Sequence, residues 1–497
     1  MILDGFIFVL QLENVLALIF GTVIGIVLGI LPGIGPTVAI ALLLPLTFGW
    51  NPTAALVLMG AVYNSAVYGG SISAILLNVP GTGPSAATLF DGYPMAEKGL
   101  ANVALGASAT ASAGGGIIGV IILIFSAPLI ADFAVKFGPP ETSLLAILAL
   151  SIIAVVERGS TVKGLISGCL GLTLATFGYD IISGDLRFTF DTYYLRDGIP
   201  LIPTAVGLFA ISQALRLGAS GETIAKLSEL KGKFLDGSKS LFQYPVTFFR
   251  SSAIGTFIGA LPGAGGVTAS FLAYAEAIRG SKTPEAFGKG HIEGVIAPEA
   301  ANNACVMGSL IPTLALGIPG SEACALFLAT MIFHGLAPGP LVFTRDAETI
   351  YTLFACLIIT NFAIFSVGAT CGRYFAKVTL VPNRIIVPLI ISISLIGSYI
   401  LRRTILDVIL ASTFGFIGFI MRERGYGLVP FILGLILGPI AERGFRQALL
   451  MSEGSYAIFV ESIIAKVLVA VIVVALCFPV VRGAAKRISY KRSSSRS

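Results

Sequence analysis

Charged residues are scarce in this sequence. Lysine, arginine, aspartate and glutamate together make up 12% of the 497 residues, whereas soluble domains usually carry about 25%. Hydrophobic residues make up 56% of the chain. A water-soluble enzyme of this length would need more charge to cover its surface, so the composition excludes that class. It indicates a protein embedded in a membrane.

Histidine and cysteine give no sign of a metal centre. Only two histidines are present, His291 and His334, so a histidine-based metal site is not expected. The six cysteines lie in apolar segments without CxxC spacing, which is typical of small packing residues in helices. The N-terminus lacks a cationic stretch before its first apolar run. We therefore expect the first helix to be kept as its own insertion signal.

Long apolar runs follow one another along the chain, for example at 15–31, 53–79 and 349–372. A helix needs about 20 apolar residues to cross a bilayer, and some of the runs are too long for one crossing while others are too short. We therefore predict an all-α polytopic membrane protein. Roughly ten to twelve transmembrane helices are expected, with broken or re-entrant segments among them.

Basic residues are absent from the first part of the chain and gather in two later places. No lysine or arginine occurs between Met1 and Glu97. The segment from Arg216 to Arg250 and the tail from Arg482 are basic, and the positive-inside rule places both in the cytoplasm. One apolar run separates the basic segment from the acidic loop at 180–197, which we therefore expect on the outer side.

Two stretches share a glycine-rich pattern. GIVLGILPGIGP begins at Gly25 and GTFIGALPGAGG at Gly255, an offset of 230 residues. Downstream, NSAVYG from Asn64 is matched by NACVMG from Asn303, and each is followed by a Pro-Gly, at an offset of 239 residues. Four anchors in the same order and with similar spacing indicate a duplicated chain.

The charge distribution suggests how the two copies are oriented. The first copy starts from an N-terminus without basic residues, and the second starts directly after the basic segment. The copies would then enter the membrane from opposite sides, as inverted repeats do in secondary transporters. The predicted domains are a first transmembrane repeat (1–216), a cytoplasmic basic loop (217–246), a second transmembrane repeat with additional helices (247–481) and a basic cytoplasmic tail (482–497).

Four Pro-Gly sequences lie inside the apolar runs or directly after them. Proline stops a helix and glycine permits the left-handed turn that follows, so each predicts a helix break within the bilayer. The next helix then offers free N–H groups and the positive end of its dipole, which suit a carboxylate or phosphate. No G-K-[ST] follows, so a Walker A loop is excluded. Kinked helices packed through glycine remain the structural alternative.

We expect the four breaks to converge and to bind an anion with several carboxylates. The predicted substrate-binding residues are Pro32, Gly33, Gly35, Thr37, Pro80, Gly81, Thr82, Ser85, Pro262, Gly263, Gly265, Thr268, Pro319, Gly320 and Ser321. Amide, hydroxyl and carboxylate oxygens suit a coupling ion. The predicted ion-coupling residues are Asn64, Ser71, Asn302, Asn303 and Glu322. Glu299 and Asp91 are further candidates for a coupling proton, with a solvated interfacial position as the open alternative.

Three stretches carry a resemblance to a known family. YGGSISAILLNVPGTGPSAATLFDGYPMAEKG from Tyr68, GALPGAGG from Gly259 and EAANNACVMGSLIPTLALGIPGSEA from Glu299 closely resemble the large permease subunit of tripartite tricarboxylate transporters, the TctA family. The resemblance implies a bacterial inner-membrane secondary carrier with several crossings and a cytoplasmic C-terminus. Its substrates would be tri- or dicarboxylates such as citrate, imported with Na⁺ or H⁺.

The same resemblance implies partners. These are a small membrane subunit (TctB-like) and a periplasmic solute-binding protein (TctC-like), in addition to the organic carboxylate substrate and the lipid bilayer. No nucleic acid, no ATP-hydrolysing subunit and no cofactor are implied, apart from Na⁺ as a possible coupling ion.

Two other function classes stay open as alternatives. One is a passive channel, and the other is a membrane-embedded enzyme acting on an anionic substrate. Such an enzyme would need a nucleophile with a base, or two carboxylates placed for acid–base chemistry. Neither arrangement is apparent in the sequence, so we expect that the chain is not an enzyme.

Overall fold

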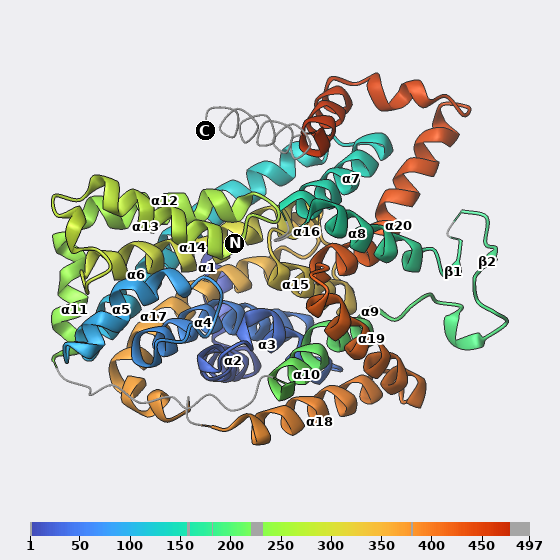
Figure 1. The fold of residues 1–497 in the computed structure, drawn as a ribbon. Coiled ribbons are helices and arrows are strands. Elements are labelled where there is room, and N and C mark those ends of the chain that lie inside the picture. The colour runs from blue at the N-terminus through green and yellow to red at the C-terminus, as the bar shows by residue number, and fades with distance from the viewer. Residues whose placement is uncertain (1, 157–159, 181, 220–231, 379–380, 478–497) are drawn as a thin grey trace, which may run out of the picture. The chain divides into compact units, whose positions relative to one another are not determined.

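The computed structural model describes residues 2–156, 160–180, 182–219, 232–378 and 381–477, and this part of the chain is almost entirely helical (Figure 1). Eight of its helices are long and apolar enough to cross a membrane by length and composition, and five shorter apolar helices accompany them. The predicted fold class, an all-α polytopic membrane protein, is confirmed. Residues 220–231 of the basic loop and the whole basic tail lie outside the described residues.

The helices of the first half are α1 (Ile2–Val9), α2 (Leu12–Ile30), α3 (Gly35–Leu43), α4 (Pro52–Leu77), α5 (Ala86–Glu97), α6 (Ala101–Ala134), α7 (Pro139–Val156), α8 (Thr161–Ala175), α9 (Leu201–Val206) and α10 (Ser212–Ala219). Those of the second half are α11 (Phe234–Ser240), α12 (Pro245–Ala260), α13 (Gly265–Gly280), α14 (Glu293–Leu316), α15 (Glu322–Phe333), α16 (Val342–Arg345), α17 (Ala347–Val378), α18 (Asn383–Arg402), α19 (Ile405–Glu423) and α20 (Leu428–Met451). A last apolar helix covers Ile463–Cys477. The strands β1 (Gly178–Tyr179) and β2 (Leu186–Arg187) pair antiparallel.

The chain forms two compact units that differ from the two halves of the duplication. The larger unit combines residues 1–135 with 202–419, and the smaller unit combines 136–201 with 420–497. Each unit therefore contains helices from both halves. The domain boundaries drawn from the sequence duplication stay a prediction.

Close helix packing in the larger unit repeats at the predicted offsets. A Cβ atom on Gly29 of α2 would overlap the carbonyl oxygen of Ala66 in α4. In the second half, a Cβ atom on Gly259 of α12 would overlap the carbonyl oxygen of Cys305 in α14. Glycine is required at both places because the two helix backbones touch. The offsets between the paired residues are 230 and 239, so the duplication extends to three-dimensional packing.

The equivalent helices α4 and α14 run in opposite directions past each other. The hydrogen bonds between them join Tyr63 to Ser309, Asn64 to Asn303, and Ser71 to Glu299. The partner's residue number falls as the residue number in α4 rises, which is the pattern of antiparallel helices. Since α4 and α14 are copies of one element, the two repeats are inverted, as predicted.

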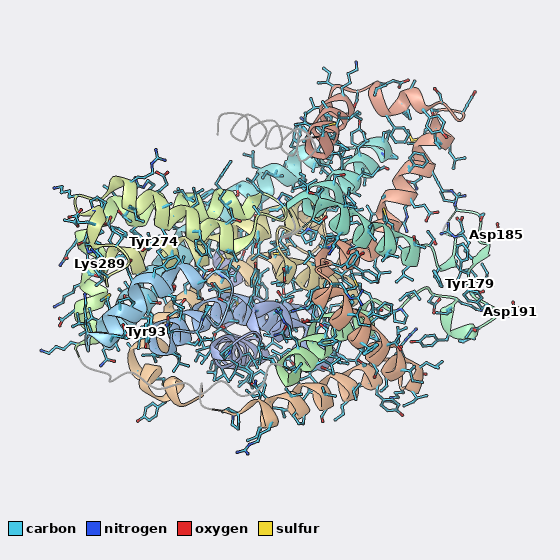
Figure 2. The ribbon with its side chains drawn as sticks, viewed as in Figure 1. Tyr93, Tyr179, Asp185, Asp191, Tyr274 and Lys289 are labelled. Atoms are coloured by element: carbon cyan, nitrogen blue, oxygen red, sulfur yellow. The ribbon has the colours of Figure 1, made fainter. Side chains whose placement is uncertain are left out.

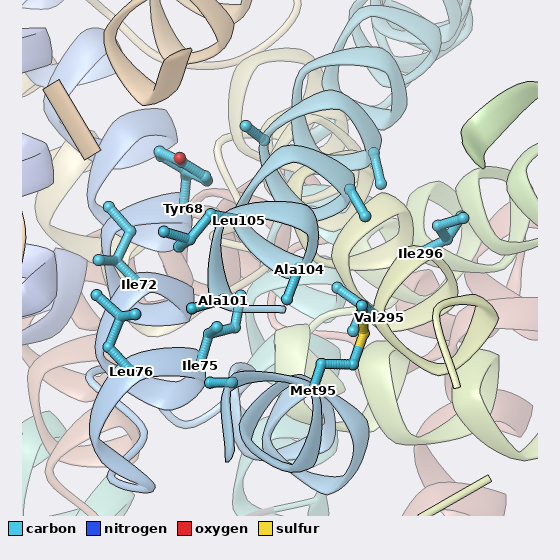
Figure 3. Close-up of a cluster of buried hydrophobic side chains, with 14 of the residues drawn as sticks. Tyr68, Ile72, Ile75, Leu76, Met95, Ala101, Ala104, Leu105, Val295 and Ile296 are labelled. Atoms are coloured by element: carbon cyan, nitrogen blue, oxygen red, sulfur yellow. The ribbon is translucent and has the colours of Figure 1, made fainter. Parts of the chain in front are cut away.

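The two halves are intertwined. Helix α4 packs on α17 of the other half, and α14 packs on α6. Buried apolar side chains from α4, α5, α6 and α14 form one cluster, in which Tyr68, Met95, Leu105 and Val295 take part (Figure 3). The core of this unit is therefore shared between the two halves.

In the smaller unit, an ion-paired loop lies against α20. Asp180, at the end of β1, is paired with Arg446, and Arg187 of β2 is 2.6 Å from Glu442. The Arg446 guanidinium, together with the backbone N–H groups of Ile182 and Ser183, holds the pKa of Asp180 well below its usual range. Asp185 and Asp191 are exposed on the same loop (Figure 2). Its position outside the membrane stays a prediction.

Candidate functional site

The first break of each half is a left-handed turn, as the sequence predicts. Gly33 and Gly35 have φ angles of 83° and 56°, and their equivalents Gly263 and Gly265 have φ angles of 81° and 67°. Side chains other than glycine are strained in this region. The chain therefore turns between α2 and α3, and again between α12 and α13, without a side chain in the way.

The second break of each half uses its glycine differently, which corrects the sequence-based interpretation. Gly81 and Gly320 are not among the residues with positive φ. A Cβ atom on Gly320 would lie 2.7 Å from the Cα of Ser309, and one on Gly81 would overlap the carbonyl oxygen of Gly29. These two glycines are needed for close backbone approach. The left-handed residues nearby are instead Asn78 and Gly317, which end α4 and α14.

The two breaks of each half are hydrogen-bonded to each other. The Gly33 N–H donates to the Gly81 carbonyl at 3.3 Å, and the Gly263 N–H donates to the Gly320 carbonyl at 3.2 Å. The Gly320 N–H donates to Thr313 Oγ1. Some of the amides that the sequence assigned to substrate are therefore already paired within the protein.

The breaks of the two halves also touch. A Cβ atom on Gly83 would lie 3.0 Å from Val267 Cγ2, and one on Gly266 would lie 2.9 Å from Pro84 Cγ. The second break of the first half thus lies against the first break of the second half. Through these contacts all four breaks form one connected group in the larger unit.

The side chains around the breaks differ in exposure. Thr268 and Glu322 are exposed and Thr37 is half-buried, whereas Thr82 and Ser85 are buried. Ser321 caps α15 by accepting a hydrogen bond from the Cys324 N–H. Its hydroxyl is also 2.7 Å from Tyr63 Oη, so a tyrosine of α4 reaches across to the last break.

Three asparagines meet between the two halves. Asn303 Nδ2 donates to Asn64 Oδ1 at 2.9 Å and to the Asn64 carbonyl at 3.1 Å. Asn64 Nδ2 donates to Asn361 Oδ1 of α17 at 3.1 Å. Asn64 and Asn303 are equivalent in the repeat, so they meet where the inverted copies cross. Asn361 was missed by the sequence analysis, although an amide inside the apolar run of α17 is a recognisable signal.

Asn302 has a buried donor without a partner. Its side chain is 2% exposed, and Nδ2 makes no hydrogen bond among the described residues. Its Oδ1 lies 3.3 Å from the place that a Cβ atom on Gly266 would occupy. The amide group therefore lies beside the first turn of α13, at the group of breaks. An unpaired buried donor costs about 1–3 kcal/mol, which indicates a position for a ligand or a water molecule.

Glu299 is a fully buried carboxylate whose partners are all side-chain hydroxyls. It is 0% exposed and accepts hydrogen bonds from four hydroxyls, those of Ser71, Thr88, Ser108 and Ser112. They belong to α4, α5 and α6. Of the two alternatives left open by the sequence, solvation at the interface is therefore excluded. Ser108 and Ser112 were missed by the sequence analysis. Their spacing of four residues places both on one face of α6. This spacing points to Glu299 only when α14 is known to pack on that face.

Asp91 is also fully buried, but its partners anchor it. Its Oδ2 accepts from Tyr274 Oη of α13 at 2.8 Å, and its Oδ1 accepts from the backbone N–H groups of Gly290 and His291. A carboxylate with three donors ties α5 to α13 and to the start of α14. Glu322, which the sequence favoured, is exposed instead.

The smaller unit has a pocket of its own. Its volume is about 420 Å³, and it is lined by residues of α7 and α20 that include Thr142, Arg443 and Gln447. The predicted substrate-binding and ion-coupling residues all belong to the larger unit, so they take no part in it.

The repeat, its paired breaks and the buried carboxylate lie within the part of the chain that one family model matches. The Tripartite tricarboxylate transporter TctA family matches residues 15–433. The chain belongs to the TctA family. This membership confirms the predicted resemblance and makes the protein a multi-pass membrane component of a tricarboxylate transporter system.

Two relatives from Agrobacterium vitis are similar over much of their length. The "Uncharacterized 52.8 kDa protein in TAR-I ttuC' 3'region" is 37% identical over 440 residues, which cover 88% of this chain and 87% of the relative. The "Uncharacterized protein in TAR-II ttuC' 3'region" is 36% identical over 211 residues, which cover 42% of this chain and 87% of the relative. No solved structure matches the chain.

Proposed function

We propose that this TctA-family chain is the large permease subunit of a binding-protein-dependent secondary transporter that imports a di- or tricarboxylate with Na⁺ or H⁺. The observation that carries the proposal is the connected group of four helix breaks at the centre of two inverted repeats. Inverted repeats with discontinuous helices are the usual architecture for alternating access around a central site.

The substrate site is proposed at the N-terminus of α13. This helix has 16 residues, and its first turn carries the positive end of the helix dipole. The unpartnered Nδ2 of Asn302 lies in the adjoining amide group, and a donor suits an anionic carboxylate oxygen. Asn302 is therefore assigned to the substrate, whereas the sequence analysis had assigned it to a coupling ion.

Buried donors other than lysine and arginine would bind the second carboxylate. The hydroxyls of Tyr63 and Ser321, which lie at the last break, are within 2.7 Å of each other. Tyr63 occupies the position in α4 that Asn302 occupies in α14, 239 residues apart. The two inverted halves thus offer one buried side-chain donor each, and we assign these two donors to the two carboxylates of the substrate.

Uptake of radiolabelled citrate and succinate by vesicles that contain the chain with its two proposed partners tests the function. We expect accumulation that stops when the Na⁺ and proton gradients are both collapsed. Accumulation that is indifferent to both gradients would overturn secondary transport. Exchange of labelled for unlabelled citrate distinguishes a carrier from the alternative of a passive channel, because a channel shows no counterflow.

Asn302→Ala tests the substrate site. Loss of one charge-assisted hydrogen bond costs about 1.5–3 kcal/mol, so KM for citrate should rise by about ten- to a hundredfold. Glu348→Gln is the control, because Glu348 is exposed in the first turn of α17. An unchanged KM in Asn302→Ala would remove this residue from the substrate site.

The remaining assignments follow from the same proposal. The proposed partners are a small membrane subunit and a periplasmic solute-binding protein, and the proposed location is a bacterial inner membrane with the C-terminus in the cytoplasm. Because the family is one of transporters, we also propose that the chain is not an enzyme. A binding protein that takes up a sugar in place of a carboxylate would contradict the substrate class.

A further inference from the structure

A carboxylate in the interior of a membrane protein needs compensation for its charge. Glu299 interacts with hydroxyls and, among the described residues, with no basic side chain. Ser71 Oγ donates to Oε1 at 2.6 Å, and Ser108 and Ser112 donate to Oε2 at 3.1 and 2.8 Å. Thr88 also donates to Oε1. The carboxylate is thus solvated by hydroxyls, but its charge is not neutralised by a cation of the protein.

Other titratable groups near Glu299 do not provide the missing positive charge. Tyr68 of α4 lies within electrostatic range of Glu299, α5 carries Asp91, and α14 carries Glu293. The part of α6 that faces Glu299, from residue 101 to 119, has no titratable residue. All of these groups are neutral or acidic. Helices α12 and α13 also pack on α14, but their arginines, Arg250 and Arg279, contact Glu276. A cation that binds Glu299 must therefore come from solution.

The distances around Glu299 suit a proton better than a metal ion. A hard cation keeps its oxygen ligands at about 2.3–2.6 Å, which holds neighbouring ligand oxygens more than about 3 Å apart. The oxygens of Ser71 and Ser112 are instead at hydrogen-bond distance from the carboxylate oxygens, 2.6 and 2.8 Å. The hydroxyls fill the places in which a metal ion would have to lie.

The asparagine cluster offers less to Na⁺ than its composition suggests. Asn303 Oδ1 has no partner among the described residues. The carbonyl and Oδ1 of Asn64 already accept hydrogen bonds from Asn303 Nδ2, however. A single unoccupied oxygen does not make a coordination shell, which takes several oxygens around one ion.

A row of hydroxyls leads from Glu299 to the helix breaks. Ser71 Oγ lies 3.4 Å from Ser85 Oγ, and Ser85 Oγ lies 2.7 Å from Thr82 Oγ1. Thr82 is in the break between α4 and α5, next to Gly83, which is exposed. Hydroxyls both donate and accept, so such a row transmits a change of protonation by reorienting its hydrogen bonds.

From these contacts we propose that Glu299 binds the proton whose downhill movement drives uptake, and that the Ser71–Ser85–Thr82 row links its protonation to the helix breaks. The inference rests on the proposed transport function and adds the coupling ion and its residue. The proton binds to a carboxylate oxygen of Glu299 from the outer solution and leaves to the cytoplasm after the halves have moved. Protonation removes the uncompensated buried charge, so the protonated carrier is the form that can change its conformation with substrate bound.

Glu299→Gln separates coupling from substrate binding. Glutamine has the same shape as protonated glutamate and cannot release a proton. Net uptake of citrate driven by a pH gradient should fall at least about tenfold, while exchange of labelled for unlabelled citrate should stay within about threefold of the wild type. The control is Glu348→Gln, in which both activities should be unchanged. If Glu299→Gln accumulates citrate in response to a pH gradient as well as the wild type does, the proposal is overturned.

Removal of a hydroxyl gives a second test that keeps Glu299 in place. Ser112→Ala deletes a donor that stabilises the ionised carboxylate, so the proton is held more tightly. The decline of uptake at high outside pH should then move upward by about half a unit to one unit. Thr110→Val is the matched control, because the Thr110 hydroxyl of the same helix donates to the Gly106 carbonyl. An identical pH profile in Ser112→Ala would contradict the proposal.

Infrared difference spectra of the purified wild-type chain test the group without any substrate. A carbonyl band of a protonated carboxyl should appear as the pH is lowered, it should be missing in Glu299→Gln, and replacing K⁺ by Na⁺ should leave its titration unchanged. If Na⁺ removes the band, Glu299 binds Na⁺ and the proposal that it binds the coupling proton is overturned. If the wild type transports neither citrate nor succinate, the proposed function fails, and these spectra still decide whether Glu299 binds a proton.

Discussion

The two inverted halves place the same helices around two equivalent positions with opposite chemistry. Glu299 of α14 lies against Ser108 and Ser112 of α6. Its equivalent, 239 residues earlier, is Gly60 of α4. The side chains around Gly60 are Leu353 and Leu357 of α17, and each lies 245 residues after the corresponding serine. The duplicated backbone thus holds one buried carboxylate in a hydroxyl shell and one apolar contact.

This difference shows that the two halves can share their helix packing and still differ in the charge of an equivalent buried position. Close helix contacts depend on glycines, and those were kept in both halves, as at Gly29 and Gly259. A second buried carboxylate would repeat the cost of removing a charge from water. The first half has leucine contacts at the equivalent position instead.

The largest effect is expected when the carboxylate is introduced on the apolar side. A Cβ atom on Gly60 would already lie 2.7 Å from Leu353 Cδ1, and the charge would have no donor. Gly60→Glu should destabilise the protein by about 3–5 kcal/mol, measured as thermal unfolding in detergent. Adding Leu353→Ser and Leu357→Ser should restore part of this loss. If the two serine substitutions restore no stability, the surroundings of Gly60 and Glu299 are not equivalent.

Glycine contacts in the two halves should respond alike. Gly29→Ala and Gly259→Ala each place a methyl group on a backbone carbonyl and should each cost about 1–3 kcal/mol. Gly168→Ala serves as the control, because its Cβ atom would lie 3.8 Å from the nearest atom, the Pro430 carbonyl oxygen. A large loss in one half and none in the other would break the packing equivalence. Thermal unfolding of the three variants is the measurement.

The asparagine pair sharpens the comparison at the place where the halves meet. Asn64→Ala and Asn303→Ala each remove one partner of the same hydrogen bonds. A double-mutant cycle should give a coupling energy of about 0.6 kcal/mol, and at most about 1.7 kcal/mol. Additive single effects would show that the contact adds nothing to stability.

The smallest effect concerns the smaller unit, which lacks the inverted centre. The pKa of Asp180 is lowered chiefly by the Arg446 guanidinium. The ionised pair therefore stabilises the fold at pH values above the unfolded-state pKa of about 4. This contribution is lost as the pH falls from that value toward the lower pKa of the folded state. Arg446→Met should therefore lower the unfolding temperature slightly at pH 7, and the difference from the wild type should shrink toward pH 3. A difference that grows on acidification would contradict this sign.

Much of the fold could be predicted from the sequence because membrane helices follow from local composition. The apolar run at 53–79 is α4, and the four Pro-Gly sequences all separate helices. The sequence did not predict that Gly81 and Gly320 permit close backbone approach and not a left-handed turn, because this role depends on which backbone lies opposite each glycine.

The choice among carboxylates could not be made locally. Glu322 follows a break directly and was favoured for that reason, but it is exposed. Glu299 had no special neighbour in the sequence, and its hydroxyl partners Ser71 and Ser112 are 228 and 187 residues away. Burial and hydrogen bonding of a side chain are set by the helices packed against it, and no local pattern encodes them.

By itself, the sequence therefore determined the membrane class, the duplication and the places where helices break, because these follow from composition and from spacing along one chain. The tertiary structure showed which residues join the breaks and where α4 and α14 cross, and it alone decided that Glu299 and not Glu322 is enclosed. The physical reason is that the inverted halves are intertwined: α6 of one half packs on α14 of the other, so each site is completed by distant residues.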